Sequence, residues 1–164
     1  MSETLPDKES VLREKSDHPA VAALQAAHPE MLADARWDRD ELTLTIPRES
    51  IVAAARAVQQ AGYNFLEDIT AVDWFPAVPR FQISYHILSH SLKERIRLRV
   101  PIDETSASLD SITPVWPSAD YYEREVFDLF GVRFDGHPNL RRIMMPDEWS
   151  GHPLRKDYPV EGYR

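Results

Sequence analysis

The chain has 164 residues, of which 19 are basic and 27 acidic, and its net charge is −8. It contains no cysteine, which excludes disulfide bonds, thiol nucleophiles and cysteine-ligated zinc or iron–sulfur centres within the chain. The acidic balance argues against general nucleic-acid binding, which needs a basic surface. A hydrophobic content of 43% favours a folded chain, and its length predicts one domain.

The first residues are dense in charges of both signs and hold no apolar run. We therefore expect a flexible N-terminal tail over residues 1–17 and no secretory signal. No apolar stretch reaches about 18 residues, so no membrane-spanning helix is expected. The folded body is expected over residues 18–130, opening with a helix in which Asp17 is the N-cap, Pro19 lies in the first turn and Pro29 marks the end.

A strand and a helix are expected next. Leu42, Leu44 and Ile46 alternate with threonines, which is the period of a half-buried strand. Pro47 ends this strand, and a helix is predicted over residues 48–61, with Gly62 at its C-terminal cap.

The central stretch predicts three further strands. Residues 63–74 are rich in aromatic and β-branched side chains, and residues 81–87 and 95–100 alternate between apolar and polar, as in a hairpin with one face of each kind. Arg95, Arg97 and Arg99 would line the polar face. A solvated face is the favoured interpretation, and a docking surface for acidic groups of a neighbour is the alternative.

Two helices are expected at the end of the body. A brief helix is predicted over residues 105–112, and a stronger one over residues 118–130, which Ser118 can cap and Gly131 can stop. From Gly131 onward the composition changes, because residues 131–164 hold four of the five glycines, show no regular period and carry a net charge of +1. This segment is nevertheless rich in large apolar side chains, so we infer that part of it folds back and part lies on another protein.

Residues of metal-site and acid–base chemistry are present, but their spacing is poor. His137, His152, Asp135, Asp157 and Glu125 are suitable metal ligands, and a stand-alone metal-dependent enzyme is therefore one alternative. The two histidines lie 15 positions apart and each precedes a proline, so turn capping or hydrogen bonding to the backbone is the favoured interpretation.

Paired carboxylates for general acid–base work could come from Asp68 and Asp73, or from Glu123 and Glu125. Helix positions i and i+2 do not face each other, so structural ion pairs are favoured for the second pair. The chain has no Gly-x-Ser-x-Gly elbow and no glycine-rich phosphate loop, so it lacks the standard means of building a serine triad or holding a nucleotide or flavin.

One family pattern stands out at the C-terminal end. Residues 123–143 read EREVFDLFGVRFDGHPNLRRI and residues 151–159 read GHPLRKDYP, with a weaker match at residues 68–73, DITAVD. These stretches resemble the C subunit of NADH–quinone oxidoreductase, the bacterial counterpart of the thirty-kilodalton subunit of mitochondrial complex I. The resemblance implies an α+β fold in a single domain, with a mostly antiparallel sheet, helices packed on one face and an extended irregular C-terminal tail.

The resemblance also implies a role. It is that of a non-catalytic structural subunit in the peripheral arm of a proton-translocating NADH–quinone oxidoreductase (NDH-1, complex I), on the cytoplasmic side of the bacterial cell membrane. No cofactor is expected in this chain, whereas FMN, iron–sulfur clusters and quinone belong to other subunits. Residues 131–164 are expected to bind the larger forty-nine-kilodalton-type partner (the D subunit), near the iron–sulfur subunits, with membrane contact only through partners and no nucleic acid. The alternative is that the chain belongs to a related membrane-bound hydrogenase or to a quinone-reducing complex whose electron donor is ferredoxin or F420.

The resemblance carries the expected interface onto specific positions. We expect Glu123, Arg124, Glu125 and Asp128 to fix the departure of the C-terminal segment by ion pairing with its arginines. The residues assigned to the family motif and partner interface are Glu123, Arg124, Glu125, Asp128, Gly131, His137, Pro138, Arg141, Arg142, His152, Pro153, Leu154, Arg155, Lys156, Asp157 and Tyr158.

Overall fold

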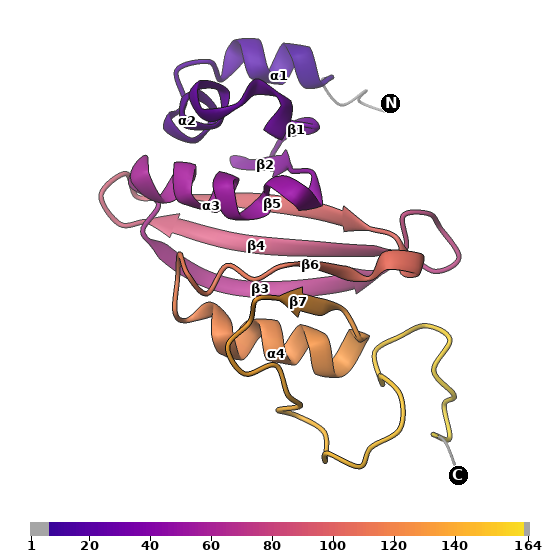
Figure 1. Cartoon of the computed structure of the whole chain (residues 1–164). Helices are drawn as coiled ribbons and strands as arrows, with labels where there is room; N and C mark the ends of the chain where they lie inside the picture. The colour runs from indigo at the N-terminus through magenta and orange to yellow at the C-terminus, as the bar shows by residue number, and fades with distance from the viewer. Residues whose placement is uncertain (1–6, 163–164) are drawn as a thin grey trace.

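The computed structural model describes residues 7–162 (Figure 1). None of the helices in this part of the chain is long and apolar enough to cross a bilayer. In chain order, the elements are α1 (Lys8–Glu14), α2 (Pro19–Ala27), the 3-10 turn η1 (Pro29–Met31), β1 (Asp34–Asp38), β2 (Glu41–Thr45), the 3-10 turn η2 (Arg48–Ser50), α3 (Ile51–Gln60), β3 (Phe65–Asp73), β4 (Phe81–Ser89), β5 (Glu94–Ile102), the 3-10 turn η3 (Glu104–Ser106), β6 (Ser108–Asp110), α4 (Ala119–Phe130) and β7 (Arg133–Asp135).

Five strands form one mixed sheet in the order β1-β2-β5-β4-β3. The neighbours are antiparallel except β2 and β5, which run parallel. The predicted hairpin of β4 and β5 is confirmed, with Tyr85 opposite Leu98. Strands β6 and β7 form a separate parallel pair.

The sheet has one apolar and one polar face. Ile83, Tyr85 and Leu98 are fully buried on the apolar face, in the same core cluster as Ile51 of α3 and Val126 of α4. The opposite face carries polar side chains such as Gln82 and is only partly covered. The expected α+β fold, with a mostly antiparallel sheet and helices on one face, is therefore confirmed (Figure 1).

The N-terminal region differs from the expectation of a flexible tail over residues 1–17. Residues 8–14 form helix α1, because Asp7 caps it and Val11 docks into the core at 1% exposure. Residues 1–6 lie outside the described part of the chain. The N-cap of α2 is His18 rather than Asp17, since the His18 side chain accepts a hydrogen bond from the amide of Ala20.

The expected helix over residues 105–112 is wrong. This stretch holds the turn η3 and strand β6, in which Leu109 faces the core and pairs with Phe134 of β7. The pairing also orders residues 133–135, which were expected to be irregular. Helix α4 begins at Ala119, with Ser118 in the N-cap position but without a side-chain capping bond, and Gly131 ends it in the left-handed conformation at φ 75°, as predicted.

Candidate functional site

A buried carboxylate on α4 holds the C-terminal segment, defined here as residues 136–162. Asp128 is fully buried, and its Oδ2 accepts hydrogen bonds from the amides of Ile143 (3.0 Å), Met144 (2.7 Å) and Met145 (2.8 Å). Its Oδ1 pairs with Nη1 of Arg142 at 2.6 Å. Burial alone would raise the pKa of Asp128, but these four donors outweigh it, and the pKa lies below its ordinary value.

The contact between α4 and residues 136–162 is called the seam here. Basic side chains close it by donating to backbone carbonyls. Arg124 of α4 donates to the carbonyls of Arg141 (3.2 Å) and Arg142 (3.1 Å), so this contact is a hydrogen-bonded one rather than an ion pair. In return, Arg142 donates to the carbonyls of Trp149 (2.9 Å) and Gly151 (3.0 Å), which folds the segment into a loop.

The end of α4 accepts a second set of donors. The Leu154 amide donates to the Leu129 carbonyl at 3.0 Å, and Nε of Arg155 donates to the Phe130 carbonyl at 2.6 Å. These carbonyls belong to the last helical turn, which has no intrahelical partners to offer them. A Cβ on Gly131 would lie 2.6 Å from the His152 ring, so only glycine lets the segment approach this closely.

A buried arginine in front of β4 ties down the far end of the segment. Arg80, only 3% exposed, pairs with Asp73 at 2.9 Å, with Glu104 at 2.6 Å and with Asp157 at 2.6 Å. Asp73 also accepts the Lys156 amide at 2.8 Å. Burial would raise the pKa of Asp73, but Arg80 and the backbone donors outweigh it and lower the pKa to about 2.

A further contact lies at the start of α4. Glu123, fully buried, accepts from the Ser111 hydroxyl at 2.6 Å and from the Ile112 amide at 2.7 Å. The buried His137 ring lies 3.9 Å from the Glu123 carboxylate. Burial raises the pKa of Glu123 to about 7 against these two donors, and the neighbouring Asp120 carboxylate adds to the rise. Contrary to expectation, Glu123 holds the loop before α4 and not an arginine of the segment.

Both histidines of the segment bond to the backbone, as the favoured interpretation holds. Nε2 of His137 lies 3.2 Å from the Asp120 carbonyl, while its Nδ1 accepts from the Asn139 amide at 3.0 Å. Nδ1 of His152 lies 2.8 Å from the Asp128 carbonyl. Within residues 7–162, no three His, Asp or Glu side chains are grouped as a metal site would require.

Large apolar side chains are exposed on the outer side of the seam, among charged ones such as Glu148. The exposed fraction is 62% for Tyr121 on α4, 62% for Met144, 40% for Trp149 and 50% for Leu154. The segment thus turns its polar backbone groups inward to α4 and presents large apolar side chains outward, as a long loop beside α4 (Figure 1). Such exposed apolar patches are typical of protein–protein contact surfaces.

Comparison with known proteins bears on this arrangement. The family model described as "Respiratory-chain NADH dehydrogenase, 30 Kd subunit" matches residues 44–164, well over half of the chain. The chain belongs to this family. The match includes the end of β2, the strands β3 to β7, the Arg80 cluster and the whole C-terminal segment.

Relatives in this family are similar over most of their length. The chain is 46% identical to the C subunit of the NADH-quinone oxidoreductase of Citrifermentans bemidjiense, covering 87% of this chain and 89% of the relative. It is 45% identical to the protein of the same name from Roseiflexus castenholzii, covering 88% and 85%. These relatives are named as subunits of NADH-quinone oxidoreductase, an enzyme complex.

Two solved structures share the fold. "Nqo5 of the trypsin-resistant fragment (1-134)" matches with a TM-score of 0.66 at 30% identity, covering 74% of this chain and 99% of the fragment. A chain of the membrane-bound sulfane sulfur reductase, an archaeal respiratory membrane complex, matches with a TM-score of 0.75 at 26% identity, covering 89% of this chain and 86% of the other.

The structure brings most of the residues predicted for the family motif into the four sets of contacts above, at Asp128, at the end of α4, at Arg80 and at Glu123. Glu125 on α4 is exposed and makes no such contact, and Arg141 and Lys156 contribute backbone groups while their residues are exposed. Sequence reasoning missed Arg80 altogether. A signal was present, because an arginine beside the apolar strand start at Phe81 must find carboxylates if it is buried.

Proposed function

We propose that this chain is a non-catalytic structural subunit of the peripheral arm of a proton-translocating NADH–quinone oxidoreductase, and that residues 136–162 clasp the larger forty-nine-kilodalton-type partner. The observation that carries the proposal is the two-sided segment: its polar side is fixed to α4, and its apolar side faces outward. A loop fixed in this way contacts a partner without first losing conformational entropy, which favours stable association.

The remaining parts of the proposal follow from the family. Curated relatives at 42–46% identity carry the name of the C subunit of NADH-quinone oxidoreductase. We propose that FMN, iron–sulfur clusters and quinone are held by other subunits, that electron transfer from NADH to quinone takes place there, and that this chain reaches the cytoplasmic side of the membrane through its partners alone. The mixture of buried ion pairs and exposed apolar groups around α4 suits such a scaffold, since the buried charged groups at the seam are occupied in structural contacts.

The test replaces the outward side chains and spares the inward contacts. Met144 and Leu154 are changed to serine in a tagged chain expressed in its native host, and the complex is purified from membranes. Burying each side chain against a partner contributes about 1.5 kcal/mol or more, so we expect each substitution to weaken retention of the large subunit by about tenfold. Both side chains are at least half exposed, so the fold remains intact.

Leu92→Ser is the matched control, because Leu92 is 43% exposed in the loop between β4 and β5, away from the segment. Loss of the large subunit from the double variant but not from the control supports the clasp. Undiminished retention in the double variant refutes it.

A second candidate function keeps the same fold and places the chain in a different respiratory complex. The high TM-score to a chain of the membrane-bound sulfane sulfur reductase favours a related membrane complex with another electron donor or acceptor. The same purification decides between the two. A flavin-binding NADH module in the purified complex supports the first candidate, and its absence together with another redox module supports the second.

A further inference from the structure

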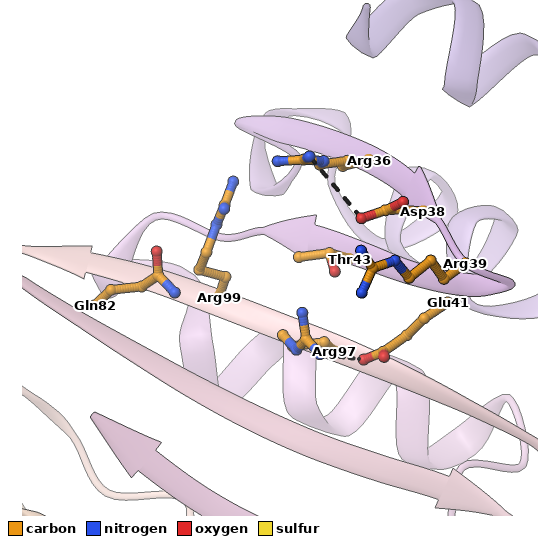
Figure 2. Close-up of a pocket in the computed structure, with 8 residues that line it drawn as sticks. All are labelled: Arg36, Asp38, Arg39, Glu41, Thr43, Gln82, Arg97 and Arg99. Carbon is orange, nitrogen blue, oxygen red and sulfur yellow. Dashed lines mark ion pairs between the residues drawn. The ribbon is translucent and has the colours of Figure 1, made fainter. Parts of the chain in front are cut away.

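A basic pocket lies on the polar face of the sheet, away from the seam with the C-terminal segment. It has a volume of about 280 Å³ and spans β1, β2, β5 and β4. Charged and polar side chains line it, as Figure 2 shows: Arg36, Asp38, Arg39, Glu41, Thr43, Gln82, Arg97 and Arg99. Four guanidinium groups thus face two carboxylates. The surrounding body is acidic: since residues 131–164 carry +1 of the total charge of −8, residues 1–130 carry −9.

Strand pairing places these groups in one row. Arg36 lies opposite Thr43, and Thr43 lies opposite Arg97 in the parallel pair of β2 and β5. Arg99 follows two residues further along β5 and therefore points to the same face. Arg39 comes from the turn between β1 and β2 and reaches over the pocket (Figure 2).

The arginines are unequally neutralised. Arg97 is engaged, since it pairs with Glu41 at 2.7 Å and donates to the His86 ring at 2.8 Å. Arg36 reaches Asp38 only at 4.0 Å, and its buried Nε has no hydrogen-bond partner. Arg99 reaches Asp34 only at 3.6 Å, and its Nε and Nη2 donate to the uncharged Thr45 hydroxyl at 3.2 and 3.0 Å. Within residues 7–162, Arg39 makes no ion pair.

We infer that this pocket is a docking site for an acidic segment of a neighbouring subunit, which places one or two carboxylates between Arg36, Arg39 and Arg99. The identity of that neighbour rests on the proposed function. Guanidinium groups donate in a fork that matches a carboxylate, so three under-neutralised arginines form a suitable receptor. The pocket lacks the apolar walls that hold a drug-sized ligand or cofactor, and its volume suits the ends of one or two acidic side chains.

Charge complementarity selects this occupant. An acidic partner segment is repelled by most of a body with a net charge of −9, and this pocket is a local basic exception on its surface. Opposite charges of this kind guide encounter and fix the register of two proteins more than they raise affinity. The site would therefore orient the neighbour on the sheet face, while the apolar side of the C-terminal segment supplies a separate contact.

The first experiment measures binding to the purified full-length chain by fluorescence anisotropy. The probes are a labelled tetraglutamate peptide and a matched tetraglutamine peptide, with inorganic phosphate as competitor. The variants are Arg39→Asn and Arg99→Gln. Asparagine tolerates the positive φ of 51° at position 39, so the turn is kept. Arg95→Gln is the control, because Arg95 lies on the same strand face but pairs with Glu67 at 3.1 Å outside the pocket.

We expect the wild type and the Arg95 control to bind tetraglutamate in preference to tetraglutamine. Each pocket substitution should weaken binding by about fivefold, the factor for one exposed ion pair at its upper range. Equal binding by the wild type and by a variant that carries both pocket substitutions overturns the inference. Phosphate binding with no preference for the glutamate peptide also overturns it, because that result indicates a site for small anions.

The second experiment identifies the neighbour in the assembled complex. Because the chain has no cysteine, Asp38→Cys introduces a unique thiol at the rim of the pocket and keeps all four of its arginines, for a crosslinker that joins a thiol to a carboxyl group. Mass spectrometry should find the link on Asp or Glu of another subunit. If the NADH–quinone oxidoreductase subunits co-purify but no such link forms, the pocket inference fails and the proposed function stands. If other redox subunits co-purify and carry the link, the proposed function fails and the pocket inference stands.

Discussion

Replacing Asp128 with asparagine should release the C-terminal segment from α4 without unfolding the body. The fully buried Asp128 carboxylate receives four donors, Arg142 and the amides of Ile143, Met144 and Met145, at 2.6–3.0 Å. Asparagine keeps the shape but loses the charge, and it turns an N–H group toward one or more of these donors. Breaking one partner of a buried pair costs about 3–5 kcal/mol, so we expect segment docking to weaken by about 3 kcal/mol.

Hydrogen exchange at the three amides that donate to Asp128 measures this change directly. A loss of about 3 kcal/mol makes the segment open about a hundredfold more often, and these amides should exchange faster by the same factor. Amides of β4 and β5 should keep their protection, because the core of the sheet does not depend on Asp128.

Glu125→Gln is the matched control on the same helix, since Glu125 is exposed and surface substitutions stay within about 0.5 kcal/mol. Unchanged exchange at Ile143, Met144 and Met145 in a folded Asp128→Asn protein would refute the reasoning.

Lowering the pH should act in the same direction as the substitution. The pKa of Asp128 lies below its ordinary value, so its contribution is present at neutral pH and is lost as the pH falls through the folded-state pKa.

Two further substitutions test the other contacts. Glu123→Gln should remove one contribution to the pH dependence of stability. The pKa of Glu123 is about 7 in the folded chain and 4.5 ordinarily, so this carboxyl should cost the wild type about 3 kcal/mol as the pH rises from 4.5 to 7, and the difference between wild type and variant in urea unfolding should shrink by that amount. A difference between wild type and variant that does not change between pH 4.5 and 7 would contradict this assignment. Arg80→Leu leaves the buried Asp73 carboxylate unpaired and should cost about 3–5 kcal/mol, whereas Asp157→Asn, at a 45% exposed side chain, should cost about 1 kcal/mol or less. Similar losses in the two variants, again by urea unfolding, would show that Asp73 is not the group that needs Arg80.

Sequence periodicity predicted the elements whose burial is local. Strand β5 alternates cleanly and β4 does so except at the buried Ser84, because one face of each lies on the core, and α4 ends where Gly131 allows a left-handed residue. Helix α1 and strand β6 were missed for a common reason. Val11 with Leu12 in α1, and Leu109 in β6, are short apolar runs in polar surroundings, too short to show a period, and β6 is ordered by β7, a partner remote in the sequence.

The candidate site was predictable in outline but not in its pairing. The resemblance named Asp128 and Arg142, and the structure joins them. It could not show that Arg124 would donate to carbonyls, because sequence shows charges but not which backbone groups lack partners. Arg80 was missed for a further reason: its partner Asp73 lies 7 positions away, but its partner Asp157 lies 77 positions away, and no local pattern shows that Arg80 joins the two.

The geometry of the seam explains why charged residues and glycine occur together in the motif. The last turn of α4 leaves carbonyls without intrahelical partners, and the Leu154 amide and Arg155 side chain supply donors only if the chain returns close to Gly131. That return also buries Asp128, which therefore needs the donors at residues 142–145. The helical half of the motif thus leaves acceptors, the α4 carbonyls and the Asp128 carboxylate, and the C-terminal half supplies their donors. These hydrogen bonds also position the outward apolar side chains. A substitution at the seam should therefore weaken partner binding even though the substituted residue does not contact the partner.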